Sequence, residues 1–300
     1  MTNVRPLRSP DGDRAGRGAN SVAAAIAAVP YTSASASEAP RITGTALVKV
    51  LGPVEIVGAR RPFTRAWSFE LVVYLAMHRR GATNDVWASA LWPERSVAST
   101  TLHSTVSAAR RALGPGIEGE DLLQRDHGVL KLSSAVTTDW MDFCELAEAP
   151  DPQSWRRALS LVAGRPFEGL HSPDWTVLEG IAASLENAVS ALALQVAEHE
   201  LDLGDPLRAM TAARRGLLAS PYDERLYRVL LRSADAQGNP AGVESAMAEL
   251  VSLLGGRVSA ARNAQEDLHP ESYVHPSTTQ LYRALSRRMA GASGGGQSTH

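Results

Sequence analysis

The sequence predicts a mainly helical protein with small β elements, divided into two folded domains. Within residues 46–140, two β-rich stretches flank three helical stretches. Downstream, helical periodicity breaks twice at a spacing of 34 residues, from Gly204 to Gly238, which is typical of stacked helix pairs. With 300 residues, 44% of them hydrophobic and 21% charged, the chain is long enough to bury two cores.

A β-hairpin is predicted at each end of the first domain. Residues 46–57 (ALVKVLGPVEIV) contain two β-prone runs, which a Gly-Pro pair at 52–53 separates. Residues 122–133 (LLQRDHGVLKLS) contain two more runs around an Asp-His-Gly turn at 126–128. Both stretches are short, so each sheet must be completed by packing against helices.

Three helical stretches lie between the hairpins. Residues 67–78 are apolar on nearly every side, which is typical of the central helix of a small domain. Residues 83–92 predict a short helix that stops at Pro93. Its predicted inward-facing residues are Val86, Ala90 and Leu91. Residues 97–114 (VASTTLHSTVSAARRALG) predict a third helix, and its terminal glycine is a typical helix stop.

The third helix has two chemically different faces. Its apolar stripe comprises Leu102, Val106, Ala109 and Leu113. Roughly opposite lie short polar side chains and a guanidinium, which can enter a DNA groove without blocking close approach. This predicted groove-facing set is Thr100, His103, Ser104, Ser107 and Arg111, with Arg110 in a flanking role. Taken alone, such a pattern more often marks an ordinary solvated surface, so the interpretation depends on the surrounding elements.

The order hairpin, three helices, hairpin is that of a winged helix. The residues that match a known type are Leu91-Trp92-Pro93, residues 101–102 and 108–114 of the third helix, and residues 128–130 of the wing. With these residues the domain resembles the winged helix of response regulators. The third helix of that fold lies in the major groove. Arg125 and Lys131 lie near the wing tip, and we predict that they contact phosphate, because a hairpin tip meets the DNA backbone first.

The charge of the chain changes along its length. Residues 41–140 hold 12 basic and 9 acidic residues, whereas residues 141–300 hold 14 basic and 20 acidic ones. A mildly basic block followed by an acidic one favours a nucleic-acid-facing domain joined to a protein-facing domain. The basic excess is small and supports only a few phosphate contacts.

The 34-residue spacing aligns further positions of the second domain. When the sequence is shifted by 34 residues, Pro206 aligns with Pro240, Ala212 with Ala246, and Leu217 with Val251. Each such helix pair has one face that it cannot bury alone, so neighbouring pairs must stack. Residues 255–277 look irregular, and 278–289 predict a last helix.

A winged helix followed directly by this helical array resembles the SARP-type regulators of actinobacteria. The second part of those proteins is called the bacterial transcriptional activator domain. The segments that follow its order are Arg157-Ala158-Leu159, Gly164-Arg165-Pro166-Phe167, Asp174-Trp175, Leu185-Glu186, Ala197-Glu198, Gly204-Asp205 and 221–226. The resemblance implies a transcriptional regulator of the activator type, whose repeats recruit RNA polymerase or mediate self-association. Val129 departs from the family, which carries an aromatic residue after the wing glycine.

Four segments are expected along the chain. They are a disordered arm at 1–42, the winged helix at 46–140, the repeat domain at 150–290 and a flexible tail at 291–300. The expected partners are double-stranded DNA, RNA polymerase or another protein through the repeat domain, and a second copy of the chain. No membrane partner is expected, because no run approaches the roughly 18 apolar residues that span a bilayer.

No cofactor, metal or catalytic site is predicted. Cys144 is the only cysteine, which excludes an internal disulfide and a multi-cysteine zinc site and favours the cytoplasm, with association to the nucleoid. Residues 114–119 (GPGIEG) match a dinucleotide motif in letters, but they follow a helix rather than a strand. His269 and His275 lack a metal-ligand spacing. Since no nucleophile or acid pair has a motif neighbour, we predict that the chain is not an enzyme.

The alternative interpretation is a protein-interaction adaptor. In this reading the winged helix no longer binds DNA specifically, and the groove of the repeats carries the function. Asp126, at the tip of the predicted wing, and the small net charge both favour it, because a carboxylate there repels phosphate.

Overall fold

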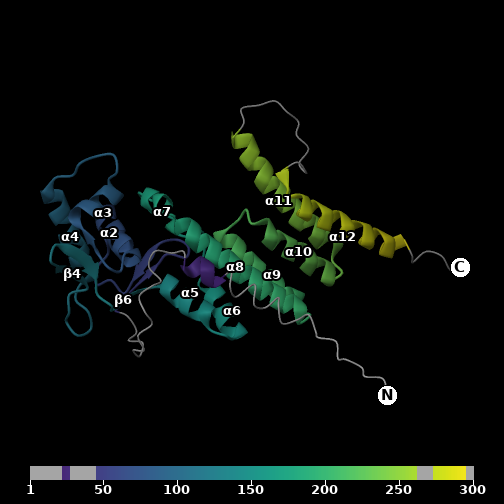
Figure 1. Ribbon diagram of the computed structural model, residues 1–300, viewed down its shortest axis with the longest axis horizontal. Helices are drawn as coiled ribbons and strands as arrows, with labels where there is room; N and C mark the ends of the chain where they lie inside the picture. Colours follow the sequence, from purple (N-terminus) through teal and green to yellow (C-terminus); the bar gives the residue numbers. More distant parts are fainter. Residues whose placement is uncertain (1–21, 28–44, 262–272, 295–300) are drawn as a thin grey trace, which may run out of the picture. The chain divides into compact units, whose positions relative to one another are not determined.

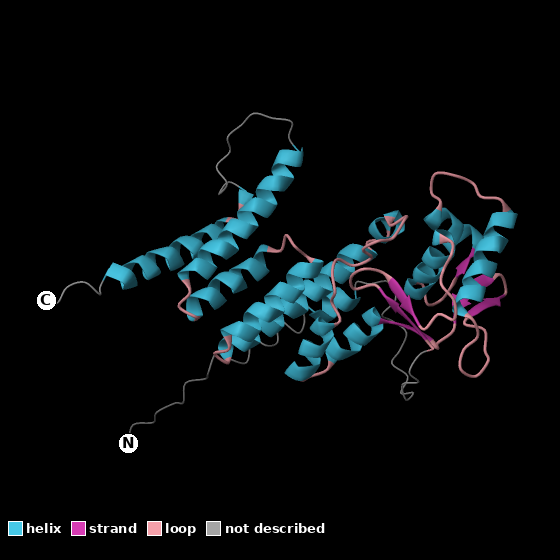
Figure 2. Cartoon of the chain, turned by 180° about the vertical axis from the view of Figure 1, so that it is seen from behind, coloured by secondary structure: helices cyan, strands magenta, loops and turns pink. Residues whose placement is uncertain are grey.

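The computed structural model describes residues 22–27, 45–261 and 273–294. The chain forms two compact units that divide between Ala188 and Val189. The mixed unit spans residues 24–188 and contains the strands of the described chain, coloured magenta in Figure 2. The helical unit comprises 189–300 together with 1–23.

The first predicted hairpin is confirmed, and it belongs to a larger sheet. Strands β1 (Ala46–Lys49) and β2 (Glu55–Val57) pair in antiparallel fashion. Strand β6 (Val136–Thr138) lies parallel to β1 on its other edge, giving the order β2-β1-β6. The sequence did not predict β6, because three residues are too few to show a period.

The second predicted hairpin, the wing, is also confirmed. Strands β4 (Leu123–Asp126) and β5 (Val129–Leu132) pair in antiparallel fashion, and β3 (Ala82–Thr83) pairs with the other edge of β5. The turn residues His127 and Gly128 have φ angles of 46° and 85°. Two successive residues with positive φ are the signature of a tight hairpin turn that matches the twist of the strands.

The three predicted helices are present as α2 (Ala66–Met77), α3 (Asn84–Leu91) and α4 (Ser99–Leu113), and α2 packs against both others (Figure 1). Of the predicted inward residues of α3, Leu91 is buried as expected and Ala90 is half-buried, but the prediction is wrong for Val86, which is 54% exposed, whereas Trp87 is fully buried. The large indole of Trp87 determines the inward face: it packs on the ring of Trp92, with 5.9 Å between ring centroids.

Three further helices complete the mixed unit. Helices α5 (Asp139–Glu148) and α6 (Pro152–Ser160) pack against each other, and α7 (Asp174–Leu178) is a short helix that contacts α3. The first two begin at side-chain caps, because Thr138 accepts a hydrogen bond from the N–H of Met141 and Asp151 accepts one from Ser154.

Helix α8 (Ile181–Asp202) runs through the division between the units, and four helices follow it in the helical unit. They are α9 (Pro206–Ala219), α10 (Glu224–Ala236), α11 (Pro240–Ala261) and α12 (Pro276–Gly294).

The 34-residue spacing corresponds to a repeated helix start. Asp205 accepts a hydrogen bond from the N–H of Arg208 at 3.0 Å, and Asn239 accepts one from Gly242 at 2.9 Å. A glycine with positive φ precedes each cap, at 74° and 62°. Corresponding positions therefore begin α9 and α11 in the same way.

Three segments differ from the sequence expectations. Helix α11 continues through Gly255, where irregular structure was expected, and a glycine costs a helix only about 1 kcal/mol. Helix α12 continues to Gly294, into the segment expected to be a tail. Residues 22–27, within the expected arm, are helical because Val22 and Ile26, one turn apart, are both buried.

Candidate nucleic-acid interface

Helix α4 is held in place by its apolar face. Leu102, Val106, Ala109 and Leu113 are all buried, as the helical spacing predicted, and the helix packs against α2. None of its residues, Ser99 to Leu113, is acidic, so its outer face carries no carboxylate of its own. That face is the natural candidate for contact with a polyanion.

The predicted groove-facing residues lie mostly in solvent. Thr100, His103, Ser107 and Arg111 are exposed. Ser104 is half-buried, and its hydroxyl donates to the carbonyl of Thr101 at 2.9 Å. Within the described residues, Arg111 makes one hydrogen bond, from Nε to the carbonyl of Ser107 at 3.3 Å, and no ion pair. The terminal nitrogens of Arg111 are therefore available to an external acceptor.

Arg110 differs from its neighbour. Its Nε and Nη2 both donate to the carbonyl of Leu123, at 3.2 and 3.0 Å. The guanidinium thereby joins α4 to the first strand of the wing. This geometry gives Arg110 a supporting position beside the groove-facing set.

The wing carries two cations with intramolecular partners. Arg125 is exposed, and its Nη2 donates to Oδ1 of Asn84 at 3.2 Å. Lys131 is half-buried, and its Nζ lies 3.4 Å from Oδ2 of Asp126. Exposed pairs of this kind are weak, so both cations can exchange these partners for phosphate.

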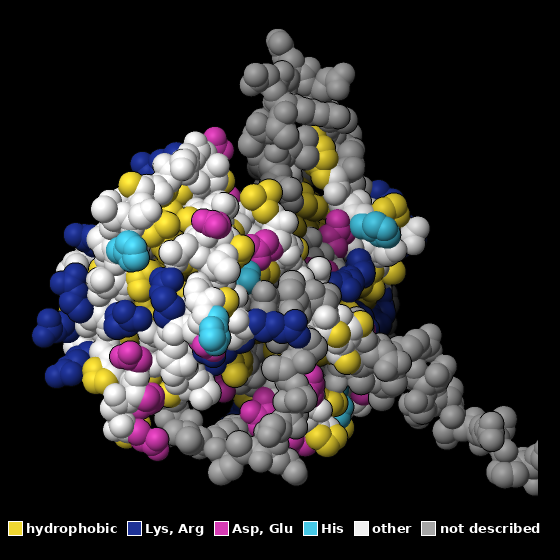
Figure 3. Space-filling view, turned by 60° about the vertical axis from the view of Figure 1, so that its left-hand side comes forward, with side chains coloured by type: hydrophobic (Ala, Val, Ile, Leu, Met, Phe, Trp, Pro, Cys, Tyr) yellow, Lys and Arg dark blue, Asp and Glu magenta, His cyan; other side chains and the backbone are white. Residues whose placement is uncertain are grey.

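A basic group that the sequence analysis did not single out lies at the end of α4. The backbone N–H groups of Arg60 and Arg61 donate to the carbonyls of Leu113 and Ala112, at 3.3 and 3.0 Å. Arg60, Arg61 and also Arg65, which caps the start of α2, are exposed and make no ion pair within the described part of the chain. In Figure 3, arginine and lysine side chains gather on one side of the face shown.

The sequence offers one signal for this group, the adjacent Arg60-Arg61 pair. It could not be placed, because the pair meets α4 about fifty residues further along the chain. Tertiary structure alone brings Arg60 and Arg61 next to the end of α4.

A buried carboxylate in the mixed unit has no cation. Oδ1 of Asp139 accepts the N–H of Val50 at 2.8 Å, and Oδ2 accepts the N–H of Leu51 at 3.1 Å. Asp139 is 6% exposed, and burial raises its pKa from 3.8 to about 6 despite these hydrogen bonds. The side chain joins α5 to the end of β1.

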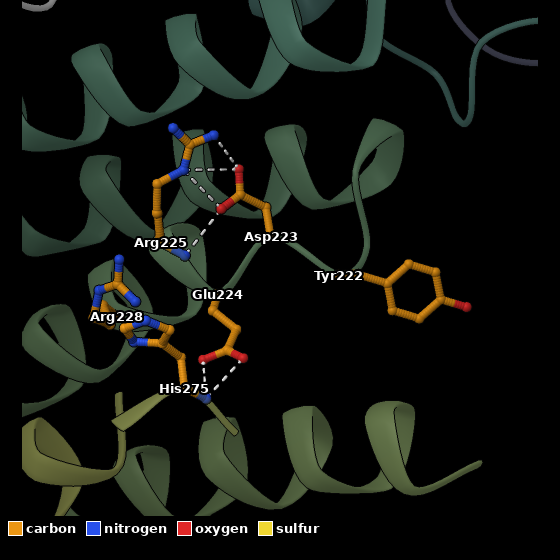
Figure 4. A pocket seen from close by; sticks show the side chains of 6 residues that line it. All are labelled: Tyr222, Asp223, Glu224, Arg225, Arg228 and His275. Atoms are coloured by element: carbon orange, nitrogen blue, oxygen red, sulfur yellow. Dashed lines mark hydrogen bonds and ion pairs between the residues drawn. The ribbon is translucent and has the colours of Figure 1, made fainter. Parts of the chain in front are cut away.

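The helical unit has a pocket at the starts of α10 and α12, lined by charged side chains (Figure 4). Arg225 lies 2.7 Å from Asp223, and the carboxylate of Glu224 accepts the N–H of His275 at 3.0 Å. Arg228 donates to Oγ1 of Thr278 at 3.0 Å. Because these groups are used to hold the two helices, we interpret the pocket as a structural junction.

Asp223 accepts several of the hydrogen bonds that hold this junction together. Burial by itself raises the pKa of its carboxyl, but hydrogen bonds from Arg225 and Ser190 outweigh burial and lower the pKa below its ordinary value. Asp223 also accepts the N–H of Arg225, as a helix cap.

The first unit thus combines a helix-turn-helix, an acid-free outer face and a hairpin wing, and helix pairs with a repeated start follow. This is the architecture of a winged helix followed by a helical repeat domain. Within the described residues, no helix combines the length and apolarity needed to span a membrane.

Comparison with known families makes the assignment more specific. Residues 145–264 match the bacterial transcriptional activator domain. A search of curated proteins found no match. Among solved structures, the chain is similar to Mycobacterium tuberculosis EmbR, determined in complex with a low affinity phosphopeptide. The two chains are 19% identical, the TM-score is 0.50, and the match covers 84% of this chain and 70% of that one.

The domain match and the shared fold confirm the predicted resemblance to a SARP-type transcriptional regulator. The predicted fold class, a winged helix followed by a helical repeat domain, is confirmed as well. The domain match indicates transcription regulation for residues 145–264, and the similar solved structure shows the fold.

Proposed function

We propose that this chain is a DNA-binding transcriptional regulator that activates transcription and reads its target with α4. The observation that supports this most strongly is the composition of that helix. Its inner face is buried against α2, whereas Thr100, His103, Ser107 and Arg111 are exposed on a helix without a carboxylate. Short polar side chains and an arginine suit base edges in the major groove.

Two groups of cations supply phosphate contacts in this proposal. Arg60 and Arg61 lie at one end of α4, with Arg65 at the start of α2, and Arg125 and Lys131 lie on the wing. Phosphate contacts fix the register of the protein on the duplex but carry no sequence information, so Arg111 is assigned the reading role. Each such contact makes binding more sensitive to salt.

The helical unit acts as the protein-facing part. We assign it the recruitment of RNA polymerase or self-association, because stacked helix pairs offer extended surfaces for other proteins. The match to the bacterial transcriptional activator domain supports this role. A regulator of this kind works where the DNA is, so we place it in the cytoplasm at the nucleoid, without a catalytic activity.

Selection from a random library of duplexes tests the proposal directly. The full chain should enrich one sequence, and its affinity for that duplex should exceed its affinity for a scrambled duplex by about 1,000-fold or more at physiological salt. Affinity for both should fall steeply as salt is raised. Absence of binding at low salt, or equal affinity for the two duplexes, would overturn the proposal.

A protein-interaction adaptor is the second candidate. It is favoured because the cations of the wing and Arg110 already have hydrogen-bond or ion-pair partners within the chain. Lys131 lies beside Asp126, Arg125 bonds Asn84, and Arg110 bonds a backbone carbonyl. If the adaptor is correct, a chain with both Arg111→Ala and Lys131→Ala should still retain its protein partner in a pulldown, and wild-type protein should shift no duplex. A duplex shift by wild-type protein that the double variant loses would exclude the adaptor.

A further inference from the structure

Helix α2 carries a buried polar stripe beside its apolar residues. Glu70, Tyr74 and His78 follow one another at a spacing of four residues, so they lie on one side of the helix. Their exposed fractions are 1%, 1% and 6%. The residues that cover this stripe belong to the strap, which we define as residues 163–180. The strap lies within the activator-domain match, which begins at residue 145.

Glu70 binds the middle of the strap. Its Oε1 accepts the backbone N–H groups of His171 and Ser172, at 2.5 and 2.9 Å. Its Oε2 is buried and has no hydrogen-bond partner among the residues that the structure describes. The hydroxyl of Ser172 donates to the carbonyl of Leu91, at 3.4 Å, so the same turn also touches the end of α3. Two backbone N–H groups of the strap thus share one oxygen of a buried carboxylate.

An aromatic cluster continues the contact along the stripe. Tyr74 and His78 stack with 3.9 Å between ring centroids, and the ring of Trp175 meets Tyr74 edge-on at 5.1 Å. At the end of the stripe, Nε2 of His78 lies 2.8 Å from Oε2 of Glu179. Trp175 is 2% exposed, so the strap contributes a core residue to the mixed unit.

The first part of the strap is bonded to the β1–β2 hairpin. The N–H of Ala163 donates to the carbonyl of Leu51 at 2.7 Å, and the N–H of Phe167 donates to the carbonyl of Val50 at 2.9 Å. Phe167 has a φ of 62°, which is uncommon for an aromatic residue and persists only where the surroundings impose it. The strap therefore has one defined path along its length.

Helix α2 in turn packs against α4, so it joins the strap to the recognition helix. We propose that the strap is a positioning element for DNA recognition and that Glu70 is the positioning residue that fixes it. Glu70 touches no DNA in this arrangement. It sets the placement of α2, and α2 sets the placement of α4. This inference rests on the proposed function.

Three full-length variants test the proposal. Glu70→Ala removes the acceptor of two backbone N–H groups of the strap, whereas Glu70→Gln keeps an oxygen in place for both. Glu55→Ala is the matched control, because it also removes one negative charge from the mixed unit, but from an exposed pair with Lys49. Affinity is measured for the enriched and the scrambled duplex, and hydrogen exchange is followed in α4 without DNA.

Glu70→Ala should lower affinity for the enriched duplex by about tenfold or more, while affinity for the scrambled duplex changes less than about twofold. Amide exchange should become faster in both the strap and α4, at a temperature well below unfolding. Glu70→Gln should restore both properties to within about twofold of wild type, and Glu55→Ala should change neither. A folded Glu70→Ala protein with wild-type discrimination and wild-type exchange in α4 would overturn the proposal.

The exchange measurement separates this inference from the proposed function. If wild-type protein binds no duplex, the proposed function fails, and faster exchange in α4 of Glu70→Ala still shows that Glu70 positions the helix. If Glu70→Ala does not fold, Glu179→Gln takes its place, because it weakens the half-exposed end of the stripe. Faster exchange in α4 of that variant supports the proposal, and exchange confined to the strap contradicts it.

Discussion

Arg111 in the mixed unit and Arg225 in the helical unit are both exposed guanidiniums on helices, but their surroundings differ. Arg225 lies 2.7 Å from Asp223, whereas Arg111 makes no ion pair within the described residues. The carboxylates Asp223 and Asp139, which are shielded from solvent to different degrees, also differ in their partners. Asp223 has a cation and a lowered pKa, whereas Asp139 has only backbone donors and a raised pKa.

This difference indicates what each unit does with charge. In the helical unit, opposite charges hold helices together, as Arg214 and Glu249 also do at 2.6 Å. In the mixed unit, Lys49 and Lys131 also have carboxylate partners. Arg60, Arg61 and Arg111 make no ion pair among the described residues, and the buried carboxylate of Asp139 is bonded to backbone N–H groups rather than to a cation. A surface that keeps its arginines unpaired retains them for an external anion, and the five predictions below test this contrast.

The largest expected effect concerns Asp139. Its folded pKa of about 6 lies above the ordinary value of 3.8, so protonation favours the folded state. The contribution of Asp139 to the free energy of unfolding should be greatest below about pH 4, fall by about 3 kcal/mol as the pH rises to about 6, and stay level above. Asp139→Asn should flatten this part of the profile, as measured by urea unfolding across the pH range. An unchanged profile would contradict the assignment.

Asp223 should show the opposite pH dependence. Because its folded pKa is lowered, its contribution is present above about pH 4 and is lost as the pH falls through the lowered value. Asp223→Ala should destabilise the protein by about 2 kcal/mol at pH 7, since it removes a helix cap and leaves Ser190 without its acceptor. Thermal unfolding measures the loss, and DNA affinity should not change.

Arg111→Ala should act on DNA binding rather than stability. Affinity for the enriched duplex should fall by about 1 to 3 kcal/mol, and discrimination among bases at one position should relax. Competition binding with single-base variants measures both, and the melting temperature serves as control. A uniform loss over all sequences would move Arg111 from the reading role to phosphate contact.

Lys131→Ala should weaken binding to enriched and scrambled duplexes alike, by less than about tenfold, and reduce the salt slope by about one. The matched variant is Asp126→Asn, which removes the partner of Lys131 and should strengthen binding. If Lys131→Ala changes only the enriched duplex, the wing reads sequence.

Arg214→Ala should have the smallest effect. Its ion pair with Glu249 is close to half exposed on both sides, and such pairs contribute less than about 1 kcal/mol. Thermal unfolding at low and high salt should show a small loss that salt removes. A loss as large as that of Asp223→Ala would show that exposure does not distinguish the two pairs.

The sequence was sufficient for the elements with a clear period or stop signal. The third helix ends at Gly114, the wing turns at His127 and Gly128, and the repeat starts at Gly204 and Gly238 recur in the structure. In each case a local rule of spacing or backbone conformation fixes the element. The groove-facing set stays a prediction, although most of its members are exposed.

The parts that the sequence did not predict depend on partners distant along the chain. Arg60 and Arg61 lie beside α4 because their backbone N–H groups donate to carbonyls about fifty positions later in the chain. The sequence gives no reason for a glutamate at position 70 of an apolar helix. The structure gives one, because Glu70 accepts hydrogen bonds from the backbone N–H groups of residues 171 and 172. Trp87 took the inward position expected of Val86, because side-chain size outweighed the local pattern.

The strap also bears on how such regulators can be recombined. The activator-domain match begins at residue 145, whereas the compact units divide at 188 and 189, inside α8. A chimera joined at residue 145 would replace the strap with a foreign one and leave the carboxylate of Glu70 facing unmatched backbone. A chimera joined within α8 keeps each core with its own sequence, so that helix is the natural crossover point for exchanging effector halves between relatives.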